Sequence, residues 1–491
     1  MNNILKKFDI DYLLVNSTNK YLVEYSSLSE NARYSLTGFS GSTGDALITE
    51  DKIYLFVDGR YHTQADNEVK DGVVVVKLQL GQKQDEEIRK LINPNGVLGI
   101  VSKKVSQSRL ESFSGYKIKL LDIDPINDFT ETHESIPQKA FNPVEYKPNA
   151  TFISNLEEVS YLTGLRDFSK DNTSKIWSKL FIDNEKRILF KDDKSCDEFL
   201  SSFEKELIVD KSSINAHDYA LIKKPVHKLS EVKFMKSKKT EEEIEAYKKA
   251  FARTDKAVYA IRDFIENNDN LSEFDIAEQL KKEFKKYGAK SLSFNSIVAI
   301  NNNSALAHYS KNSKNVILKD GDLVLIDCGA YYESGLATDI TRVFVKGNPS
   351  ELQKRVYTTV LKAFLTCFNN AESLETGFEI DTLAHSILDN SIEGFKFNHG
   401  LGHGIGINVH EAPPNLSQND IAKTKIQNGM CFTIEPGLYN KEYFGVRLEN
   451  SCYKKDDKVF SFTNMCYENK LIDYSLLTSQ EIKWLKEFNV K

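Results

Sequence analysis

Polar and apolar positions repeat in two similar blocks in the first half of the chain. In each block a polar helical stretch ends in Leu-Thr-Gly and one apolar residue, at 36–39 and at 162–165, and an apolar strand that ends in aspartate follows. Glycine suits the position after a helix, and a short apolar strand closed by a turn is typical of α/β proteins. The repetition predicts two related α/β domains, residues 1–128 and 129–236, with the proline-containing stretch 128–150 as a linker.

The pattern changes near residue 237. Thr240 and Glu243 form a capping box ahead of a long amphipathic helix, and short apolar strands separated by turns follow. We expect helices at 241–266, 272–287, about 350–368 and about 379–389, and strands at 430–439 and 445–454. Helices mixed with antiparallel strands predict an α+β domain over residues 237–491.

Composition narrows the class of protein. The chain has 491 residues, 40% hydrophobic and 28% charged, which is ordinary for a folded protein of several domains. Its net charge of -6 is dispersed, and no basic stripe points to nucleic acid. No apolar run approaches the ~18 residues that a membrane span needs. The start of the chain lacks the features of a signal peptide, and the six cysteines form no C-x-x-C pair. We expect a cytoplasmic protein with buried thiols.

Four carboxylates stand at unusual places in apolar strands. Asp327 ends "LVLID", Asp339 opens "DITRVFV", Glu435 interrupts "CFTIEPG" and Glu449 closes "VRLEN". Any one of them could be an ordinary solvated residue. Together they would repel one another unless a cation neutralised them. A divalent cation, or a pair, fits better than arginine, because Arg447 is the only nearby candidate in these strands.

The stretch "HGLGHGIGINVHE" (399–411) holds three of the nine histidines of the chain. Its four glycines exclude a helical H-E-x-x-H zinc motif, and their spacing misses the G-x-G-x-x-G fingerprint. In an extended strand His399 and His403 share a face, while His410 falls opposite unless the chain bends. We therefore expect different roles, one histidine binding metal and another donating a proton or hydrogen bond.

One imidazole with four carboxylates suits Mn²⁺, Co²⁺, Fe²⁺ or Zn²⁺. Bridging carboxylates can hold two such ions ~3.5–4 Å apart, where they acidify water and polarise a carbonyl. This combination of ligands indicates a hydrolase.

These motifs resemble those of the pita-bread metallopeptidases of family M24, in particular the Xaa-Pro aminopeptidases of the three-domain cytosolic type. The matching segments are "HYS" (308–310), "DCGAYYESGLATDITR" (327–342), "HGLGHGIGINVHE", "TIEPG" (433–437), "VRLEN" (446–450), "LTGFSGSTGDALITEDKIYLFVDGRY" (36–61) and "LIDYSLLTSQEIKWLKEF" (471–488). The resemblance implies two creatinase-like α/β domains followed by a pita-bread catalytic domain with a C-terminal extension. It also implies a homodimer whose substrates are peptides with proline at position two.

The resemblance implies a role for each candidate residue. Two divalent ions, Mn²⁺ before Co²⁺ or Zn²⁺, would be bound by Asp327, Asp339, His403, Glu435 and Glu449, with Asp339 and Glu449 as bridges. Glu435 would also accept a proton from the bridging hydroxide. The catalytic and substrate-side residues would be His308 and His410, which stabilise the oxyanion, His399, which lines the substrate site without ligating, and Arg447, which orients a carboxylate.

Two features depart from the family pattern. Asp327 and Asp339 are twelve positions apart, where the family has eleven. We expect the extra residue to be absorbed in a hairpin loop within "YYESGLA" (331–337); a slipped register would instead turn Asp339 away from the site. The second α/β domain is also shorter than usual, which bears on the preferred peptide length.

Three functions remain open at this point. The first is an aminopeptidase that cuts the bond before a proline at position two. The second is a prolidase limited to Xaa-Pro dipeptides, which no single residue separates from the first. The third is a metal-free pita-bread scaffold that only binds, which is disfavoured because all five ligand candidates are present.

Overall fold

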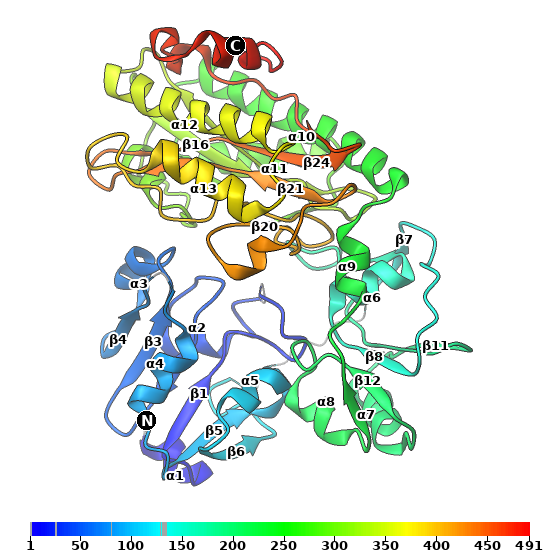
Figure 1. The fold of residues 1–491 in the computed structure, drawn as a ribbon. Helices are drawn as coiled ribbons and strands as arrows, with labels where there is room; N and C mark the ends of the chain where they lie inside the picture. The colour runs from blue at the N-terminus through cyan, green and yellow to red at the C-terminus, as the bar shows by residue number, and fades with distance from the viewer. Residues whose placement is uncertain (1, 25–26, 80, 128, 130–134) are drawn as a thin grey trace. The chain divides into compact units, whose positions relative to one another are not determined.

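The computed structural model describes residues 2–24, 27–79, 81–127, 129 and 135–491 (Figure 1). The chain folds into two compact units. The first unit comprises residues 1–136, 143–163 and 176–231, and the second comprises residues 137–142, 164–175 and 232–491. The boundary predicted at residue 128 lies outside the described residues, and the division at 128 and 236 stays a prediction. The chain passes between the units several times before the second one continues without interruption.

Two α/β sheets make up the first unit. One has the order β4-β3-β2-β1-β5-β6 and the other β11-β10-β8-β12-β13. The strands of the first sheet are β1 (Tyr12–Val15), β2 (Ala46–Ile48), β3 (Ile53–Val57), β4 (Val73–Lys77), β5 (Val97–Val101) and β6 (Lys117–Leu121), with helices α1 (Asn2–Phe8), α2 (Ala32–Thr37), α3 (His62–Glu68), α4 (Gln84–Leu91) and α5 (Gln107–Ser112). The strands of the second are β8 (Thr151–Ile153), β10 (Leu180–Ile182), β11 (Arg187–Leu189), β12 (Leu207–Val209) and β13 (Pro225–His227), with helices α6 (Leu156–Thr163), α7 (Asp193–Ser202) and α8 (Ala216–Leu221).

The two sheets share a topology. In each, the first strand pairs antiparallel with the next strand of a meander and parallel with a later strand: β1 with β2 and β5, and β8 with β10 and β12. The repeated Leu-Thr-Gly closes a helix in both, because Gly38 and Gly164 have φ of 79° and 68°, where a side chain would be strained. The α/β fold expected of this half is confirmed.

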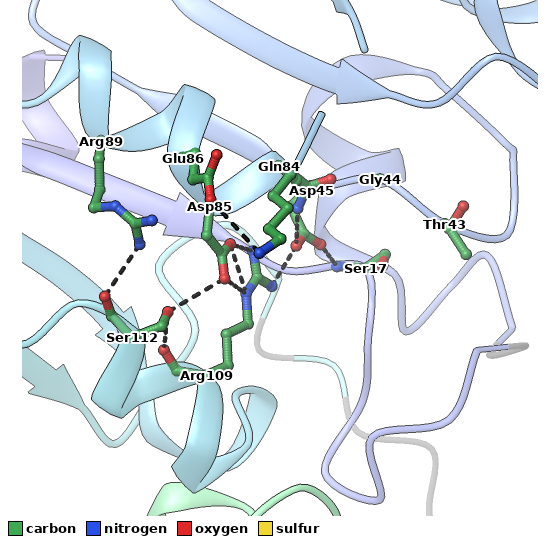
Figure 2. Close-up of a pocket in the computed structure, with 11 residues that line it drawn as sticks. Ser17, Thr43, Gly44, Asp45, Gln84, Asp85, Glu86, Arg89, Arg109 and Ser112 are labelled. Atoms are coloured by element: carbon green, nitrogen blue, oxygen red, sulfur yellow. Dashed lines mark hydrogen bonds and ion pairs between the residues drawn. The ribbon is translucent and has the colours of Figure 1, made fainter. Parts of the chain in front are cut away.

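A polar cavity of about 560 Å³ lies in the first sheet's part of this unit (Figure 2). Arg109, on α5, forms ion pairs there with Asp45, just before β2, and with Asp85, on α4. Asp45 also accepts hydrogen bonds from the Ser17 backbone N–H and from Gln84. The buried charge is compensated within the cavity, so this network joins two helices to the sheet.

The second unit is an antiparallel sheet between two pairs of helices. The sheet has the order β15-β16-β18-β24-β21, with β25 added to β24. Its strands are β15 (Ile297–Ile300), β16 (Leu323–Cys328), β18 (Ile340–Val345), β21 (Cys431–Ile434), β24 (Glu449–Lys455) and β25 (Lys458–Ser461). Its helices are α9 (Val232–Ser237), α10 (Glu241–Asn267), α11 (Glu273–Lys286), α12 (Glu351–Asn370), α13 (Gly377–Leu388) and α14 (Ser479–Leu485). Two-stranded pairs complete it: β7 (Gln138–Lys139) with β9 (Leu165–Arg166), β14 (Ser291–Leu292) with β17 (Ala330–Tyr331), β19 (Gly402–His403) with β20 (Asn415–Leu416), and β22 (Gly437–Tyr439) with β23 (Gly445–Arg447).

Alternation along β16 divides the core of this unit. Val324 and Ile326 pack in the cluster that contains α10 and α11 residues, whereas Leu323 and Leu325 pack in the cluster that contains α12 and α13 residues. Asp327 continues the second series, so its side chain faces the side of the sheet that carries α12 and α13.

The four predicted helices of this unit are confirmed within about two residues at their ends, as is the capping box: the Glu243 backbone N–H donates to Thr240 Oγ1 at 3.2 Å, and Glu243 Oε2 accepts from the Thr240 backbone N–H at 2.9 Å. The two predicted strands are each divided. The first stops before Glu435, because Pro436 has no N–H to continue the ladder. The second is interrupted at Leu448, whose N–H donates instead to the Pro436 carbonyl at 3.2 Å.

No helix in the described part of the chain is both long and apolar enough to cross a membrane.

The cavity network generates a stability prediction. Replacing Arg109 with Met leaves Asp45 buried without its cation, and breaking a buried pair in this way costs about 3–5 kcal/mol. We expect R109M to lower the urea midpoint of the first unit, read from Trp177 fluorescence in a W484F background, where no tryptophan of the second unit contributes. K83M, at a side chain that is 79% exposed, is the control. Equal midpoints for R109M and K83M would contradict the network's role.

Candidate metal centre

Strand register aligns the candidate carboxylates on one face of the second unit's sheet. Asp327 on β16 is opposite Thr341 on β18, and Thr341 is opposite Glu449 on β24. Asp339 precedes Thr341 by two positions and so points to the same face. Glu435 follows Ile434, whose partner is Asn450, and therefore lies beside Glu449. Five positions from four strand segments thus converge through pairing alone.

The twelve-residue spacing between the first two aspartates is absorbed in a hairpin loop. The Thr338 N–H donates to the Ala330 carbonyl at 3.0 Å and the Gly335 N–H to the Tyr332 carbonyl at 2.8 Å. The pairing of β16 with β18 runs without a slip from 323 opposite 345 to 328 opposite 340. Asp339 therefore keeps its orientation toward the other carboxylates.

Asp339 and Glu449 are buried, Asp327 and Glu435 are partly exposed, and the four carboxylates repel one another. Burial, together with the neighbouring carboxylates, raises the pKa of Asp339 and of Glu435 well above the ordinary values. Burial and the charge of Asp327 raise the pKa of Glu449 to about 8. Arginine offsets only part of this charge: Arg447 Nη2 lies 2.6 Å from Asp327 Oδ2, and its Nε lies 3.8 Å from Glu435 Oε2.

Two of these carboxylate oxygens have no hydrogen-bond partner. They are Oδ1 of Asp327 and Oδ1 of Asp339, both buried among the described residues. Leaving an ionised oxygen buried and unpaired is costly, and a cation bound between the two aspartates would remove that cost. Ligand atoms of Asp339, His403 and Glu449 also lie within 4.8 Å of one another. Hard oxygen donors with one imidazole fit divalent ions such as Mn²⁺, Co²⁺ or Zn²⁺.

His403 is oriented toward this group by its backbone. Its Nδ1 donates to the Gly404 carbonyl at 3.0 Å, which leaves Nε2 with its lone pair. Nε2 lies 3.6 Å from Asp339 Oδ2 and 3.6 Å from Glu435 Oε1. The glycine before it is required by close approach, because a Cβ at Gly402 would lie 2.1 Å from the Thr433 carbonyl oxygen.

The chain bends after His403, so His410 does not fall on the far side of a strand. The two rings meet edge to face with centroids 4.4 Å apart. The Glu411 N–H donates to the Gly404 carbonyl at 2.8 Å, which closes residues 404–411 into a loop. The sequence predicted His410 on the opposite face unless the chain bends, and the chain does bend. His410 therefore lies beside the candidate metal ligand His403.

His399 belongs to a hydrogen-bonded chain that ends at the carboxylates. Its Nδ1 donates to the Gly400 carbonyl at 2.8 Å, and its Nε2 accepts from the Tyr439 hydroxyl at 2.7 Å. That hydroxyl in turn accepts from Arg447 Nη1 at 2.9 Å, and Arg447 contacts Asp327. Both ring nitrogens of His399 are engaged, so it is not available as a ligand.

His308 lies in the turn that follows β15, near the strand of Arg447. The neighbouring Tyr309 is fixed by its hydroxyl, which donates to Glu273 Oε2 at 2.6 Å. Ser304, earlier in the turn, accepts from the Gly445 N–H on β23 at 2.8 Å. The role of His308 at this site stays a prediction.

Sequence reasoning missed two residues of this site. Thr341 donates to Glu449 Oε2 at 2.7 Å and accepts from Arg447 Nε at 3.3 Å. Tyr439 connects His399 to Arg447 as described above. The signal for Thr341 was present, since it follows Asp339 by two positions on a strand, but its partners depend on pairing between strands distant in sequence.

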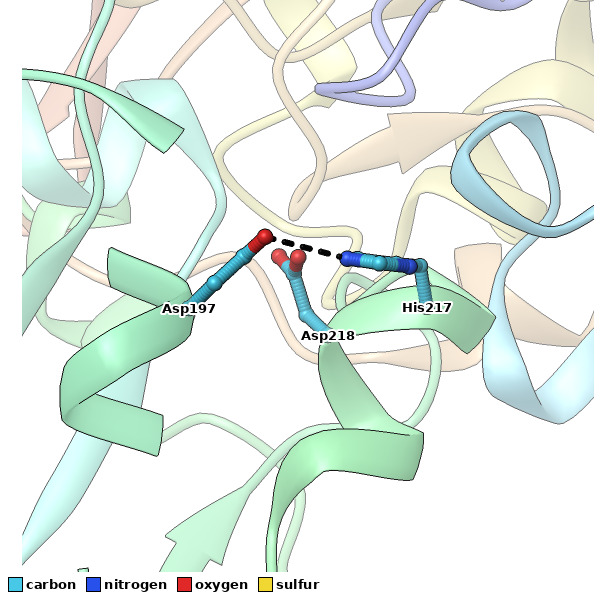
Figure 3. Close-up of side chains that lie close together, drawn as sticks. All are labelled: Asp197, His217 and Asp218. Atoms are coloured by element: carbon cyan, nitrogen blue, oxygen red, sulfur yellow. Dashed lines mark hydrogen bonds and ion pairs between the residues drawn. The ribbon is translucent and has the colours of Figure 1, made fainter. Parts of the chain in front are cut away.

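A second group of potential ligands lies in the first unit (Figure 3). His217 Nε2 is 3.3 Å from Asp197 Oδ2, and Asp218 is close to both. Asp218 is already neutralised by the buried ammonium group of Lys179 and accepts from Asn215. An ion-pair cluster accounts for this group, and we assign no metal to it.

Known proteins match this chain over nearly all of its residues. The chain is 27% identical to Xaa-Pro aminopeptidase 1 of Dictyostelium discoideum, over 99% of this chain and 91% of that protein. It is 24% identical to aminopeptidase P2 of Arabidopsis thaliana, over 98% of this chain and 82% of that protein. A solved X-prolyl aminopeptidase of Caenorhabditis elegans, described as a cytosolic enzyme with a di-nuclear active site, matches with a TM-score of 0.84 at 21% identity, over 97% of this chain and 90% of that one.

Two family models match separate parts of the chain. Residues 1–128 match the creatinase/prolidase N-terminal domain, and residues 245–455 match metallopeptidase family M24. The second match contains all five candidate metal ligands and the glycine-rich histidine stretch. The chain is a hydrolase with a metallopeptidase family M24 domain over residues 245–455 and a creatinase/prolidase N-terminal domain over residues 1–128.

Proposed function

We propose that this chain is a metal-dependent aminopeptidase that hydrolyses the bond between the first residue and a proline at position two of a peptide. The observation that carries the proposal is the row of carboxylates beside His403, with two aspartate oxygens that lack partners, within an M24 fold. Relatives that align with nearly all of this chain, over about nine-tenths of their own length, bear the name Xaa-Pro aminopeptidase, which favours this substrate class over others in the family.

We assign the metal site to five residues. Two divalent ions would be held by Asp327, Asp339, His403, Glu435 and Glu449. When bound, such a pair acidifies a water molecule and polarises the scissile carbonyl. We take Mn²⁺ as the metal, with Co²⁺ and Zn²⁺ as alternatives that accept the same ligands.

The remaining residues would bind and orient the substrate. Glu435, at the edge of the carboxylate row, would accept a proton during attack. His410, beside His403, would donate a hydrogen bond to the carbonyl oxygen as negative charge develops on it. Arg447 would keep Asp327 in orientation through its 2.6 Å contact. His399 and His308 would line the substrate side.

We also propose a cellular location, an oligomeric state and a domain layout for the enzyme. The description of the C. elegans protein as cytosolic supports a cytoplasmic location. We also propose a homodimer and a three-domain layout with residues 1–128, 129–236 and 237–491. Two such domains ahead of the catalytic one in the sequence favour an aminopeptidase of longer peptides over a prolidase.

The decisive assay uses protein stripped of metal and then supplied with Mn²⁺. Release of arginine from Arg-Pro-Pro only in the presence of metal would support the aminopeptidase. Cleavage of Ala-Pro but not of Arg-Pro-Pro would identify a prolidase. Cleavage of neither, with no metal retained, would contradict the proposal and favour a binding scaffold.

Substitutions separate metal ligands from substrate-side residues. We expect D339N to lose bound metal and to lose turnover by more than about 100-fold, because even outer-sphere partners cost 10- to 100-fold when lost. H410A should keep its metal while kcat falls on the order of 10²- to 10³-fold, as for other oxyanion donors. Metal content by atomic spectroscopy and kcat on Arg-Pro-Pro give the comparison. Metal loss in H410A would show that its role is assigned wrongly.

The carboxylate pKa values predict how metal-free protein responds to pH. Between pH 4.5 and about 8 the folded state holds a proton on Glu449 that the unfolded state has lost, so stability falls as pH rises through this window. By linkage the loss between pH 5 and pH 8 is about 3–4 kcal/mol, which would lower the Tm of a unit of this size by roughly 6–16 °C. Calorimetry of metal-free protein at pH 5 and pH 8 tests this expectation. E449Q, which stays neutral, should show a smaller fall, and Mn²⁺ should stabilise the wild type more at pH 8.

A further inference from the structure

The loop of residues 404–411 is anchored by groups outside the catalytic sheet. We call it the His410 loop. The hydrogen bond between the Glu411 N–H and the Gly404 carbonyl closes it, and β20 follows it in sequence. Two of the segments that contact it carry buried lysines: residues 164–175, which lie between two portions of the first unit in sequence, and residues 236–239, just ahead of α10.

Glu411 is the first anchor. Its side chain is 1% exposed and lies 3.2 Å from Lys236 Nζ and 2.9 Å from Lys239 Nζ, each of which is 3% exposed. The same carboxylate accepts the N–H groups of Ile407 and Asn408 at 2.9 and 3.3 Å, so it closes the loop on itself. Burial disfavours its charge, but the two ammonium groups outweigh burial and hold the pKa of Glu411 at about 2.

Lys175 is the second anchor. Its Nζ donates to Asn408 Oδ1 at 3.2 Å, and the amide of Asn408 donates to the backbone carbonyl of His410 at 3.1 Å. Lys175 and Asn408 are 4% and 8% exposed. The segment that carries Lys175 is itself fixed in the second unit, because Ser174 Oγ donates to the Gly335 carbonyl at 2.7 Å.

Between these anchors the backbone of the loop is closely packed and hydrogen-bonded. A Cβ at Gly406 would lie 2.0 Å from Glu411 Oε1, and the Gly406 carbonyl accepts from the Ala337 N–H and from the Tyr247 hydroxyl. Apolar residues would pack such a region at least as favourably, since buried ion pairs seldom add net stability. Three buried lysines directed at one loop are better explained by the conformation that they impose.

We propose that Lys175, Lys236 and Lys239 are positioning residues that hold the His410 loop, and with it the imidazole of His410, beside the metal ligands. The inference rests on the proposed aminopeptidase activity for its consequence in catalysis. Each lysine acts through another residue: Lys236 and Lys239 through Glu411, and Lys175 through Asn408 and the His410 carbonyl. None of the three is proposed to contact the substrate.

The test uses the full chain loaded with Mn²⁺ and substitutes Lys175 by Met, which keeps most of the side-chain volume. K175M should lower kcat on Arg-Pro-Pro on the order of 10-fold or more, since small displacements of a positioned group cost up to 10²-fold. Metal content and KM should change little. Hydrogen exchange of a peptide covering 404–411 should rise, because the N–H groups of Ile407 and Asn408 report the loop. K256M, at an exposed lysine of α10, is the matched control and should change neither quantity.

A second variant keeps the test open if K175M does not fold. N408A removes the residue through which Lys175 would act, so it should lower kcat in the same way, and the double variant should lose no more than either single one. Wild-type kcat and wild-type exchange in folded K175M or N408A would overturn the inference. So would a loss of metal that parallels the loss of kcat, since the lysine would then support the ligands instead of the loop.

The two proposals fail in different ways. If the wild-type chain does not cleave Arg-Pro-Pro, the proposed function fails, while faster exchange of the loop in K175M alone would still support the anchoring. If the wild type cleaves and the variants match it in both readouts, the anchoring fails and the function stands.

Discussion

Mutual repulsion between carboxylates is the constraint around which the second unit is built. An antiparallel register places Asp327, Thr341 and Glu449 in one row across three strands, and Asp339 and Glu435 extend it. Such a group raises its own pKa values and leaves oxygens without partners. A sheet core would not tolerate this arrangement unless a cation offset it. The arrangement of these side chains therefore indicates a binding site for a cation, whose positive charge the side chains alone do not supply.

Arginines fix the geometry of this group without neutralising it fully. Arg342, on the opposite face of β18 from Thr341, donates to the backbone carbonyls of Glu449, Met465 and Cys466. It thereby joins β18 to β24 at the point where the row depends on register. Arg447 works on the same face as the carboxylates, contacting Asp327 and Tyr439. One arginine stabilises the pairing of strands, and the other stabilises the orientation of a side chain.

Local signals in the sequence were sufficient for the four helices predicted in the second unit and singled out the four carboxylates that the sheet brings together. The capping box at Thr240 and Glu243 predicted where α10 begins, because that interaction involves only neighbouring residues. Alternation within single strands predicted which face each carboxylate occupies. Cross-strand pairing could not be predicted in this way, so Thr341 and Tyr439 were missed. The bend that brings His410 to His403 depends on Glu411 with its paired lysines and on Lys175, which contacts Asn408 from 233 positions away, and no short pattern contains these contacts.

The alternation of the chain between the two units has a consequence for modularity. Residues 137–142 and 164–175 belong to the catalytic unit, although they are encoded within the sequence of the α/β half. A fragment that begins at 237 would lack the β7–β9 pair and the lysine that contacts Asn408. Cutting the chain at 237 therefore removes part of the catalytic unit itself. A separate catalytic unit would have to be assembled from three segments of the chain, 137–142, 164–175 and 232–491.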